Sequence, residues 1–181
     1  AGGRSTRLDT DKSLILLDNK PLYQLAQEKL SPFCTDVFYS INKSQTLPLK
    51  NWVLDKYDDQ GPLSGILSAL DFIDKPLLVL AVDMPAIQRS TIEFLLKQHR
   101  PNKKVTAYYN TEKQLWEGLV SIWEPSILPD LATYFEGGGR SLQKFLHQIN
   151  AFKVPIIDAS EFRSINTALD LDYFGIKDQL G

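Results

Sequence analysis

The sequence predicts an α/β protein with a mostly parallel central sheet and a small antiparallel element in its second half. Apolar stretches alternate with amphipathic ones along most of the 181 residues, as strands and helices alternate in such a fold. The run 76–82 is apolar and stops at Asp83, as expected of a central strand covered on both faces. Apolar residues make up 43% of the chain and charged residues 23%, a balance typical of a folded globular protein.

The individual strands and helices follow from local residue patterns. Segment 36–42 combines β-branched and aromatic residues, which favour a strand, and 51–57 is a second short strand-like run. After the turn at Gly61-Pro62, apolar residues recur at helical spacing. The strands expected are 36–42, 51–57, 76–82, 105–109, 119–123 and 152–157, and the helices expected are 21–30, the segment after 61–62, 90–99, 127–135, 141–149 and 167–174.

Two of the expected strands differ from the rest because a short polar turn joins them. Segments 105–109 and 119–123 flank this turn, which lies around residues 111–113. A short connection favours an antiparallel pair, and we expect the pair at a sheet edge or in a flap. Because no repeat, low-complexity tract or linker interrupts the sequence, we expect a single domain over residues 1–181.

Charge and cysteine content exclude several classes of protein. The chain has 20 Lys and Arg against 22 Asp and Glu, so it lacks the net positive charge with which proteins bind nucleic-acid backbones. Its one cysteine, Cys34, cannot form an internal disulfide, which fits a reducing compartment. No apolar run approaches the roughly 20 residues that span a bilayer, and no signal peptide is recognisable. We expect a cytoplasmic protein that binds neither nucleic acid nor membrane.

The first twelve residues carry the strongest functional signal. The adjacent glycines Gly2 and Gly3 let the backbone approach a bulky anion, and Ser5 adds a hydroxyl donor. Arg7 and Lys12 place cations in the same loop, so a nucleoside triphosphate is the expected ligand. The glycine spacing is neither that of a P-loop nor that of a dinucleotide-binding loop. Taken alone, the segment could also be a glycine turn with solvated basic residues.

This segment resembles the signature of the molybdenum cofactor guanylyltransferases, the MobA-like nucleotidyltransferases. Further matches follow in the family's order along essentially the whole chain, and the Ala-Gly-Gly form is typical of guanylyl rather than cytidylyl members. The matching runs are Ala1-Gly2-Gly3-x-Ser5-x-Arg7-Leu8-x-x-Asp11-Lys12, Lys20-Pro21-Leu22, Ser40-Ile41-Asn42, Gly61-Pro62-Leu63-Ser64-Gly65-Ile66, Val82-Asp83-Met84-Pro85 and Ile165-Asn166-Thr167.

Two places depart from the family pattern. Leu8-Asp9 stands where Met-Gly is usual, so a carboxylate enters the phosphate loop, where it either repels a triphosphate or points outward. Ser164 and Ala168 replace an Asn and a Pro of the late motif, which puts the contacts of that motif in doubt. These departures leave open a nucleotide-binding module without turnover.

The resemblance implies a Rossmann-like three-layer nucleotidyltransferase fold. It also implies transfer of GMP from GTP to molybdopterin, or to its molybdenum-loaded form, with release of pyrophosphate. Magnesium is the implied cofactor, and transient contacts with other proteins of cofactor biosynthesis are implied as well. Because the first strand of such a fold leads directly into Ala1-Gly2-Gly3, the resemblance implies an apolar strand upstream of Ala1. A related transferase that uses CTP or a sugar-phosphate acceptor is the alternative enzyme.

The chemistry implied at this site needs positioning and charge neutralisation more than a covalent nucleophile. We expect Arg7 and Lys12 to be catalytic, because they can stabilise negative charge that grows on the α-phosphoryl and leaving groups. Asp83, at the carboxyl end of a strand, is the expected magnesium ligand. Capping of the following helix is the alternative role of Asp83.

Contacts to the base and ribose are expected where successive strands end. Asn42 and Asp55 lie at such ends, where open α/β sheets bind ligands, although Asn42 alone could equally form a strand-end turn. The residues expected to bind the nucleotide are Ala1, Gly2, Gly3, Ser5, Lys12, Asn42, Asp55, Gly61, Leu63 and Gly65.

Three residues are expected on the acceptor side. Arg140 follows three glycines just before a helix, where it could hold the acceptor's phosphate. The same stretch could instead be a flexible connection with Ser141 as the N-cap. Asn166 and Thr167 are assigned to the acceptor by resemblance alone.

Overall fold

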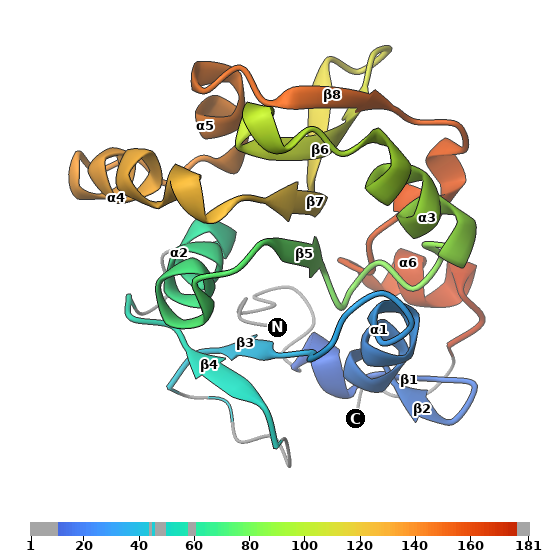
Figure 1. The fold of residues 1–181 in the computed structure, drawn as a ribbon. Helices are drawn as coiled ribbons and strands as arrows, with labels where there is room; N and C mark the ends of the chain where they lie inside the picture. The colour runs from blue at the N-terminus through green and yellow to red at the C-terminus, as the bar shows by residue number, and fades with distance from the viewer. Residues whose placement is uncertain (1–10, 44, 46–49, 58–60, 177–181) are drawn as a thin grey trace.

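The computed structural model describes residues 11–43, 45, 50–57 and 61–176, and these form a layered α/β structure (Figure 1). A four-stranded sheet holds its strands in the order β5, β7, β6, β8. Strands β5, β6 and β8 run in one direction and β7 runs against them. The bounds of these strands are β5 Leu77–Leu80, β6 Val105–Asn110, β7 Leu115–Trp123 and β8 Phe152–Pro155.

Two smaller pairs of strands precede this sheet in the chain. Strands β3 (Tyr39–Ile41) and β4 (Trp52–Leu54) pair in parallel. Strands β1 (Leu16–Leu17) and β2 (Lys20–Pro21) form an antiparallel hairpin. Its two connecting residues, 18 and 19, both have positive φ, at 51° and 61°, as the tight hairpin turns of twisted strands require.

The predicted antiparallel pairing of the hairpin 105–123 is confirmed, but its predicted place at an edge or in a flap is wrong. Strand β7 lies between β5 and β6, and β6 lies between β7 and β8, so both strands are internal to the four-stranded sheet. The register between β6 and β7 shifts after Ala107, which pairs with Ser121, to Tyr108, which pairs with Glu117. A bulge of this kind locally disrupts the ladder of hydrogen bonds and increases the twist of the strands.

Helices cover both faces of the sheet, and some begin at residues that favour a helix start. Helix α2 shows the reason, because Gly61 at its N-cap has φ +79° and Pro62 occupies the first turn, where no backbone N–H is needed. The helices are α1 Leu22–Leu30, α2 Pro62–Ile73, α3 Arg89–Gln98, α4 Leu128–Glu136, α5 Leu142–Gln148 and α6 Ala168–Tyr173, with short 3-10 turns η1 Lys12–Leu14, η2 Pro101–Lys103, η3 Pro125–Ile127 and η4 Ala159–Phe162. Within the described part of the chain, no helix is long and apolar enough to cross a membrane.

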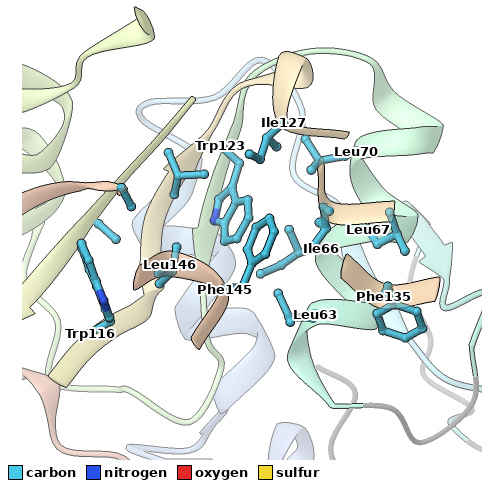
Figure 2. Close-up of a cluster of buried hydrophobic side chains, with 14 of the residues drawn as sticks. Leu63, Ile66, Leu67, Leu70, Trp116, Trp123, Ile127, Phe135, Phe145 and Leu146 are labelled. Carbon is cyan, nitrogen blue, oxygen red and sulfur yellow. The ribbon is translucent and has the colours of Figure 1, made fainter. Parts of the chain in front are cut away.

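Side chains along β5 point alternately to the two faces of the sheet, where two large hydrophobic clusters lie. Leu77 and Val79 pack against a cluster formed with α2, α4 and α5, in which Trp123 and Phe145 stack with their ring planes 1° apart (Figure 2). Leu78 and Leu80 pack against the cluster on the opposite face, to which α3 contributes. A third, smaller cluster joins α1 and α6 near β1. The expected cover of this strand on both faces is therefore confirmed. The strand is shorter than the predicted 76–82, and in the described four-stranded sheet it lies at one end of the strand order and not at the centre.

Candidate functional site

Three side chains from distant parts of the sequence meet at one point. The Nζ of Lys12 lies 3.2 Å from Oδ2 of Asp83 and 2.6 Å from Oδ1 of Asn166. Lys12 is the first residue of η1, Asp83 follows β5, and Asn166 precedes α6. The side chains of Lys12 and Asp83 keep only 16% and 22% of their surface exposed, so the ion pair is partly shielded from water.

Local hydrogen bonds hold each member of this group in place. Asp11 caps η1 by accepting from the backbone N–H of Ser13 at 2.9 Å and from its hydroxyl at 2.7 Å, which fixes the turn that carries Lys12. The backbone carbonyl of Asp83 accepts from the N–H of Ile165 at 2.8 Å, so the segment that carries Asn166 is tied to the end of β5.

The turn after β5 positions the Asp83 carboxylate. Helix α3 begins at Arg89 with Gln88 as its N-cap, so Asp83 does not cap that helix. Lys29 on α1 donates to the carbonyl of Pro85 and thereby supports the turn from the other side. Burial lowers the pKa of the Lys29 ammonium, and the charge of Glu161 partly opposes this shift.

A second polar group lies where β3 and β4 end. Asp55 is 5% exposed, and its carboxylate accepts from the hydroxyl of Ser40 at 2.5 Å. Its backbone N–H donates to the carbonyl of Ile41 at 2.8 Å, and the side chain of the neighbouring Asn42 is also buried. A Cβ on Gly65 would lie 2.3 Å from the Ser40 hydroxyl oxygen. Glycine is therefore required for α2 to pack against this pair.

Two further predicted nucleotide contacts lie at the start of α2. Gly61 has a positive φ and open space around it, so its conformation rather than crowding selects glycine. Leu63 is completely buried in the core, so neither its side chain nor its backbone is exposed at this position. The hydroxyl of Ser64 donates to the carbonyl of Tyr57 at 2.7 Å and ties the helix to the end of β4.

Two of the residues predicted on the acceptor side, Arg140 and Thr167, make contacts that stabilise helix ends. The Arg140 guanidinium lies 3.8 Å from the ring centroid of Phe135 and donates to the Phe135 carbonyl at 2.6 Å, at the end of α4. Ser141 is the N-cap of α5, as the alternative interpretation of this loop predicted. Thr167 caps α6 in a capping box with Asp170. Only Asn166 among the three hydrogen-bonds to Lys12 in the described contacts.

Comparison with known proteins decides the family. The model of the MobA-like NTP transferase domain matches residues 1–152. The molybdenum cofactor guanylyltransferase of Yersinia pseudotuberculosis serotype O:1b (strain IP 31758) is 31% identical over 180 residues, which cover 95% of this chain and 90% of the relative. The chain belongs to the MobA-like NTP transferase family. The resemblance drawn from the sequence motifs is therefore confirmed, and the protein is a nucleotidyltransferase.

Solved structures agree on the fold of this MobA-like protein. Molybdopterin-guanine dinucleotide biosynthesis protein A from Archaeoglobus fulgidus matches with a TM-score of 0.76 at 23% identity, over 96% of this chain and 93% of that one. The 2-C-methyl-D-erythritol 4-phosphate cytidylyltransferase from Thermus thermophilus matches with a TM-score of 0.71 at 10% identity, over 90% of this chain and 91% of that one. At these identities the likeness establishes the fold alone, and the expected nucleotidyltransferase fold is confirmed.

Part of the predicted site of this MobA-like enzyme lies outside the described residues. That part comprises the phosphate loop, with Ala1, Gly2, Gly3, Ser5 and Arg7. Among the described residues, no three His, Cys, Asp or Glu side chains are grouped to hold a metal, so Asp83 is not part of such a cluster there. Sequence reasoning missed Gln45, whose amide donates to Asp11 at 2.7 Å.

Proposed function

We propose that this MobA-like enzyme transfers GMP from GTP to the phosphate of molybdopterin, free or molybdenum-loaded, and releases pyrophosphate. The observation that carries the proposal is the meeting of Lys12, Asp83 and Asn166, because each comes from a different family motif. The Yersinia relative, which is named for guanylyl transfer to the molybdenum cofactor, supports GTP as the nucleotide.

The proposed reaction is an in-line displacement at the α-phosphorus of GTP. An oxygen of the acceptor's phosphate forms the new P–O bond, and the bond between the α-phosphorus and the oxygen that bridges to the β-phosphate breaks. Negative charge grows on the pyrophosphate that leaves and on the α-phosphoryl oxygens. Placement of both substrates and neutralisation of this charge supply most of the catalysis in such reactions.

Lys12 is the described residue best placed to neutralise that charge. Its ammonium group is held by Asp83 and Asn166 on one side, so it is oriented before a substrate binds. A positioned cation acts more strongly where its contact with water is limited, and the side chains of Lys12 and Asp83 are only partly exposed. Arg7 is the second proposed cation, and it belongs to the loop with Gly2, Gly3 and Ser5.

Asp83 is the proposed magnesium ligand. Mg²⁺ is commonly held by one or two carboxylates, substrate phosphates and water, so a single carboxylate at the end of a strand fits this ion. Oδ2 of Asp83 contacts Lys12, and the side chain remains 22% exposed, which suits a carboxylate that a cation must reach. When bound, the ion supplies further neutralisation of the triphosphate charge.

The nucleoside is proposed to bind at the ends of β3 and β4. Asn42 and Asp55 are buried polar groups there. Gly61, Leu63 and Gly65 are the proposed contacts from the start of α2, where Gly61 is exposed and the other two residues are buried. Thr167 and Arg140 are the other two proposed acceptor contacts, and both also make the structural contacts described above. Asn166 is the stronger acceptor-side residue, because it already touches Lys12.

We place this reaction in the cytoplasm, where the enzyme would receive molybdopterin by transient contact with other proteins of cofactor biosynthesis. Burial raises the pKa of the Cys34 thiol, which disfavours the reactive thiolate form. We assign Cys34 no part in the proposed chemistry.

Calorimetry followed by a turnover assay tests the proposed function. The protein is titrated with GTP, CTP and ATP in the presence of magnesium, and the nucleotide that binds is then incubated with molybdopterin. We expect selective GTP binding, and one pyrophosphate and one guanine dinucleotide formed for each GTP consumed. Preference for CTP would contradict guanylyl transfer and favour the related transferase that uses CTP. Binding of GTP without pyrophosphate release would point to a nucleotide-binding module.

A further inference from the structure

Gln45 connects the two halves of the candidate site. Its side-chain Nε2 donates to Oδ2 of Asp11 at 2.7 Å, and its Oε1 accepts from the backbone N–H of Asn42 at 3.2 Å. Its own backbone N–H donates to the carbonyl of Asn42 at 3.1 Å. One side chain therefore links the residue after β3 to the residue before Lys12.

The chemistry of the two partners fixes the orientation of the Gln45 amide. The backbone N–H of Asn42 can only donate, so the amide oxygen must face it. The Asp11 carboxylate can only accept, so the amide nitrogen must face the carboxylate. A flipped amide would lose both bonds, and any residue without one donor and one acceptor would lose at least one.

The Asp11 end of this connection is tightly defined. Oδ1 of Asp11 accepts from the N–H and the hydroxyl of Ser13, and Oδ2 accepts from Gln45. Hydrogen bonds to an ionised carboxylate are shorter and stronger than bonds between neutral groups. Because Asp11 caps η1, whose first residue is Lys12, a displacement of Asp11 also displaces the start of that turn.

We propose that Gln45 is a positioning residue that sets the spacing between the nucleoside end of the site, at Asn42, and the phosphate cation, Lys12. The proposal rests on the proposed function, because it takes these two residues as contacts to the same nucleotide. Without the Gln45 amide, we expect the segments that carry Asn42 and Lys12 to remain folded, but the distance between them is less tightly fixed. A misplacement of about 1 Å between reacting groups can lower the rate about a hundredfold.

Reversal of the hydrogen bond gives a direct test. Gln45→Glu sets two carboxylates against each other, and Asp11→Asn sets two amide donors against each other. The double variant Asp11→Asn/Gln45→Glu keeps one donor and one acceptor between the two positions with their direction reversed. We expect each single variant to lower kcat about tenfold to a hundredfold with a smaller change in the KM for GTP. We expect the double variant to recover to within about threefold of wild type.

Gln24→Glu is the matched control for the charge change. The amide of Gln24 also donates to a carboxylate, that of Glu28 at 3.3 Å, but on the exposed face of α1. This variant is expected to keep the wild-type kcat. Melting temperatures of all the variants are measured in parallel, so that assays run well below the lowest transition.

Three results would overturn the proposal. They are a wild-type kcat in Gln45→Glu, a double variant no more active than the single ones, and a lowered melting temperature with unchanged kcat. The wild-type enzyme is assayed first, so a preference for CTP or a lack of turnover counts against the proposed function and not against Gln45. If the enzyme prefers CTP, kcat of the same variants is measured with CTP. If there is no turnover, their nucleotide affinity is measured by calorimetry. In both cases, wild-type values in both single variants would overturn the role of Gln45.

Discussion

Lys12 and Asp83 are 71 residues apart in the sequence, and their charged groups lie 3.2 Å apart in the structure. Ion pairs that retain contact with water contribute on the order of 1 kcal/mol or less to stability. A gain in stability therefore does not explain why Lys12 and Asp83 form an ion pair, whereas the proposed chemistry does. In the proposed mechanism, Lys12 is the cation for the phosphates and Asp83 is the carboxylate for magnesium, and the two charges neutralise each other before the substrates bind.

Replacement of the cation tests the role of Lys12. Lys12→Ala is expected to lower kcat about 10²- to 10³-fold, because a charge directed at the transition state is lost. Pyrophosphate release with GTP and molybdopterin provides the measurement. Lys20→Ala is the control, since the Lys20 ammonium pairs with Glu28 at 2.9 Å on an exposed surface. Unchanged turnover in Lys12→Ala would remove this residue from the mechanism.

Replacement of the proposed magnesium ligand, Asp83, separates catalysis from folding. Asp83→Asn is expected to abolish both activity and its dependence on magnesium, while the melting temperature stays within a few degrees of wild type. The fold should survive because the Asp83 side chain caps no described helix. Asp71→Asn, which breaks the exposed pair with Lys56, is the matched control. An unfolded Asp83→Asn protein would show that the carboxylate is structural.

Gly65→Ala should damage the nucleoside end of the site through packing. The added Cβ would lie 2.3 Å from the Ser40 hydroxyl oxygen and 3.4 Å from the Asp55 carboxylate. Overpacking of this kind costs about 1–3 kcal/mol, which lowers the melting temperature by roughly 3–10 °C in a protein of this size. Nucleotide affinity should fall as well, because the Ser40–Asp55 hydrogen bond must shift.

Ser40→Ala in the Gly65→Ala background provides the internal check. Removal of the hydroxyl relieves the closest contact, and the remaining distance to the Ser40 Cβ is 3.3 Å. We expect the double variant to regain part of the lost melting temperature without recovery of nucleotide affinity, since the Ser40 hydroxyl no longer donates to Asp55. Full recovery of affinity would show that the Ser40–Asp55 bond plays no part in binding.

Glu117 should make stability depend on pH in a predictable direction. Burial raises the pKa of its carboxyl, and the charge of Lys113 opposes this only partly. Between the ordinary pKa and the raised one, the folded protein binds more protons than the unfolded chain. The free energy of unfolding therefore falls as pH rises through that window.

Glu117→Gln removes the titrating group and with it this loss of stability. The variant is expected to melt a few degrees above wild type at neutral pH and close to wild type at acidic pH, where the wild-type carboxyl is also neutral. Thermal melts across this pH range give the comparison. Glu112→Gln, at an exposed position in the same hairpin, should leave the pH profile unchanged. A constant difference between Glu117→Gln and wild type at every pH would contradict the prediction.

Local patterns predicted most of the elements but not all of their limits. Helical spacing located α2 and α4 within a few residues, because amphipathic spacing is a property of the segment itself. The strand expected at 36–42 contracts to Tyr39–Ile41, because a strand ends where its partner ends and β4 has only three residues. The place of β7 inside the sheet depends on pairing with β5, which the hairpin's own sequence does not encode.

The motifs identified chemistry-bearing residues without showing which of them meet. Lys12 and Asn166 are 154 residues apart, so their 2.6 Å contact depends on the whole fold and not on spacing. Gln45 carries no motif of its own, and a single glutamine after a strand is ordinary in sequence. Its connecting role becomes visible only when both of its hydrogen-bond partners are known.

The 154 residues between Lys12 and Asn166 also determine the order in which the contacts of Lys12 can form during synthesis. At about 5–20 residues per second, a ribosome needs roughly 8–30 s to proceed from Lys12 to Asn166. Asp83 is translated about midway, so the newly made lysine can meet the carboxylate well before it can meet the amide. A chain released before residue 166 would contain the pieces of the main hydrophobic clusters yet lack the group that completes the lysine's surroundings. The contacts among Lys12, Asp83 and Asn166 are therefore completed only late in the synthesis of each molecule.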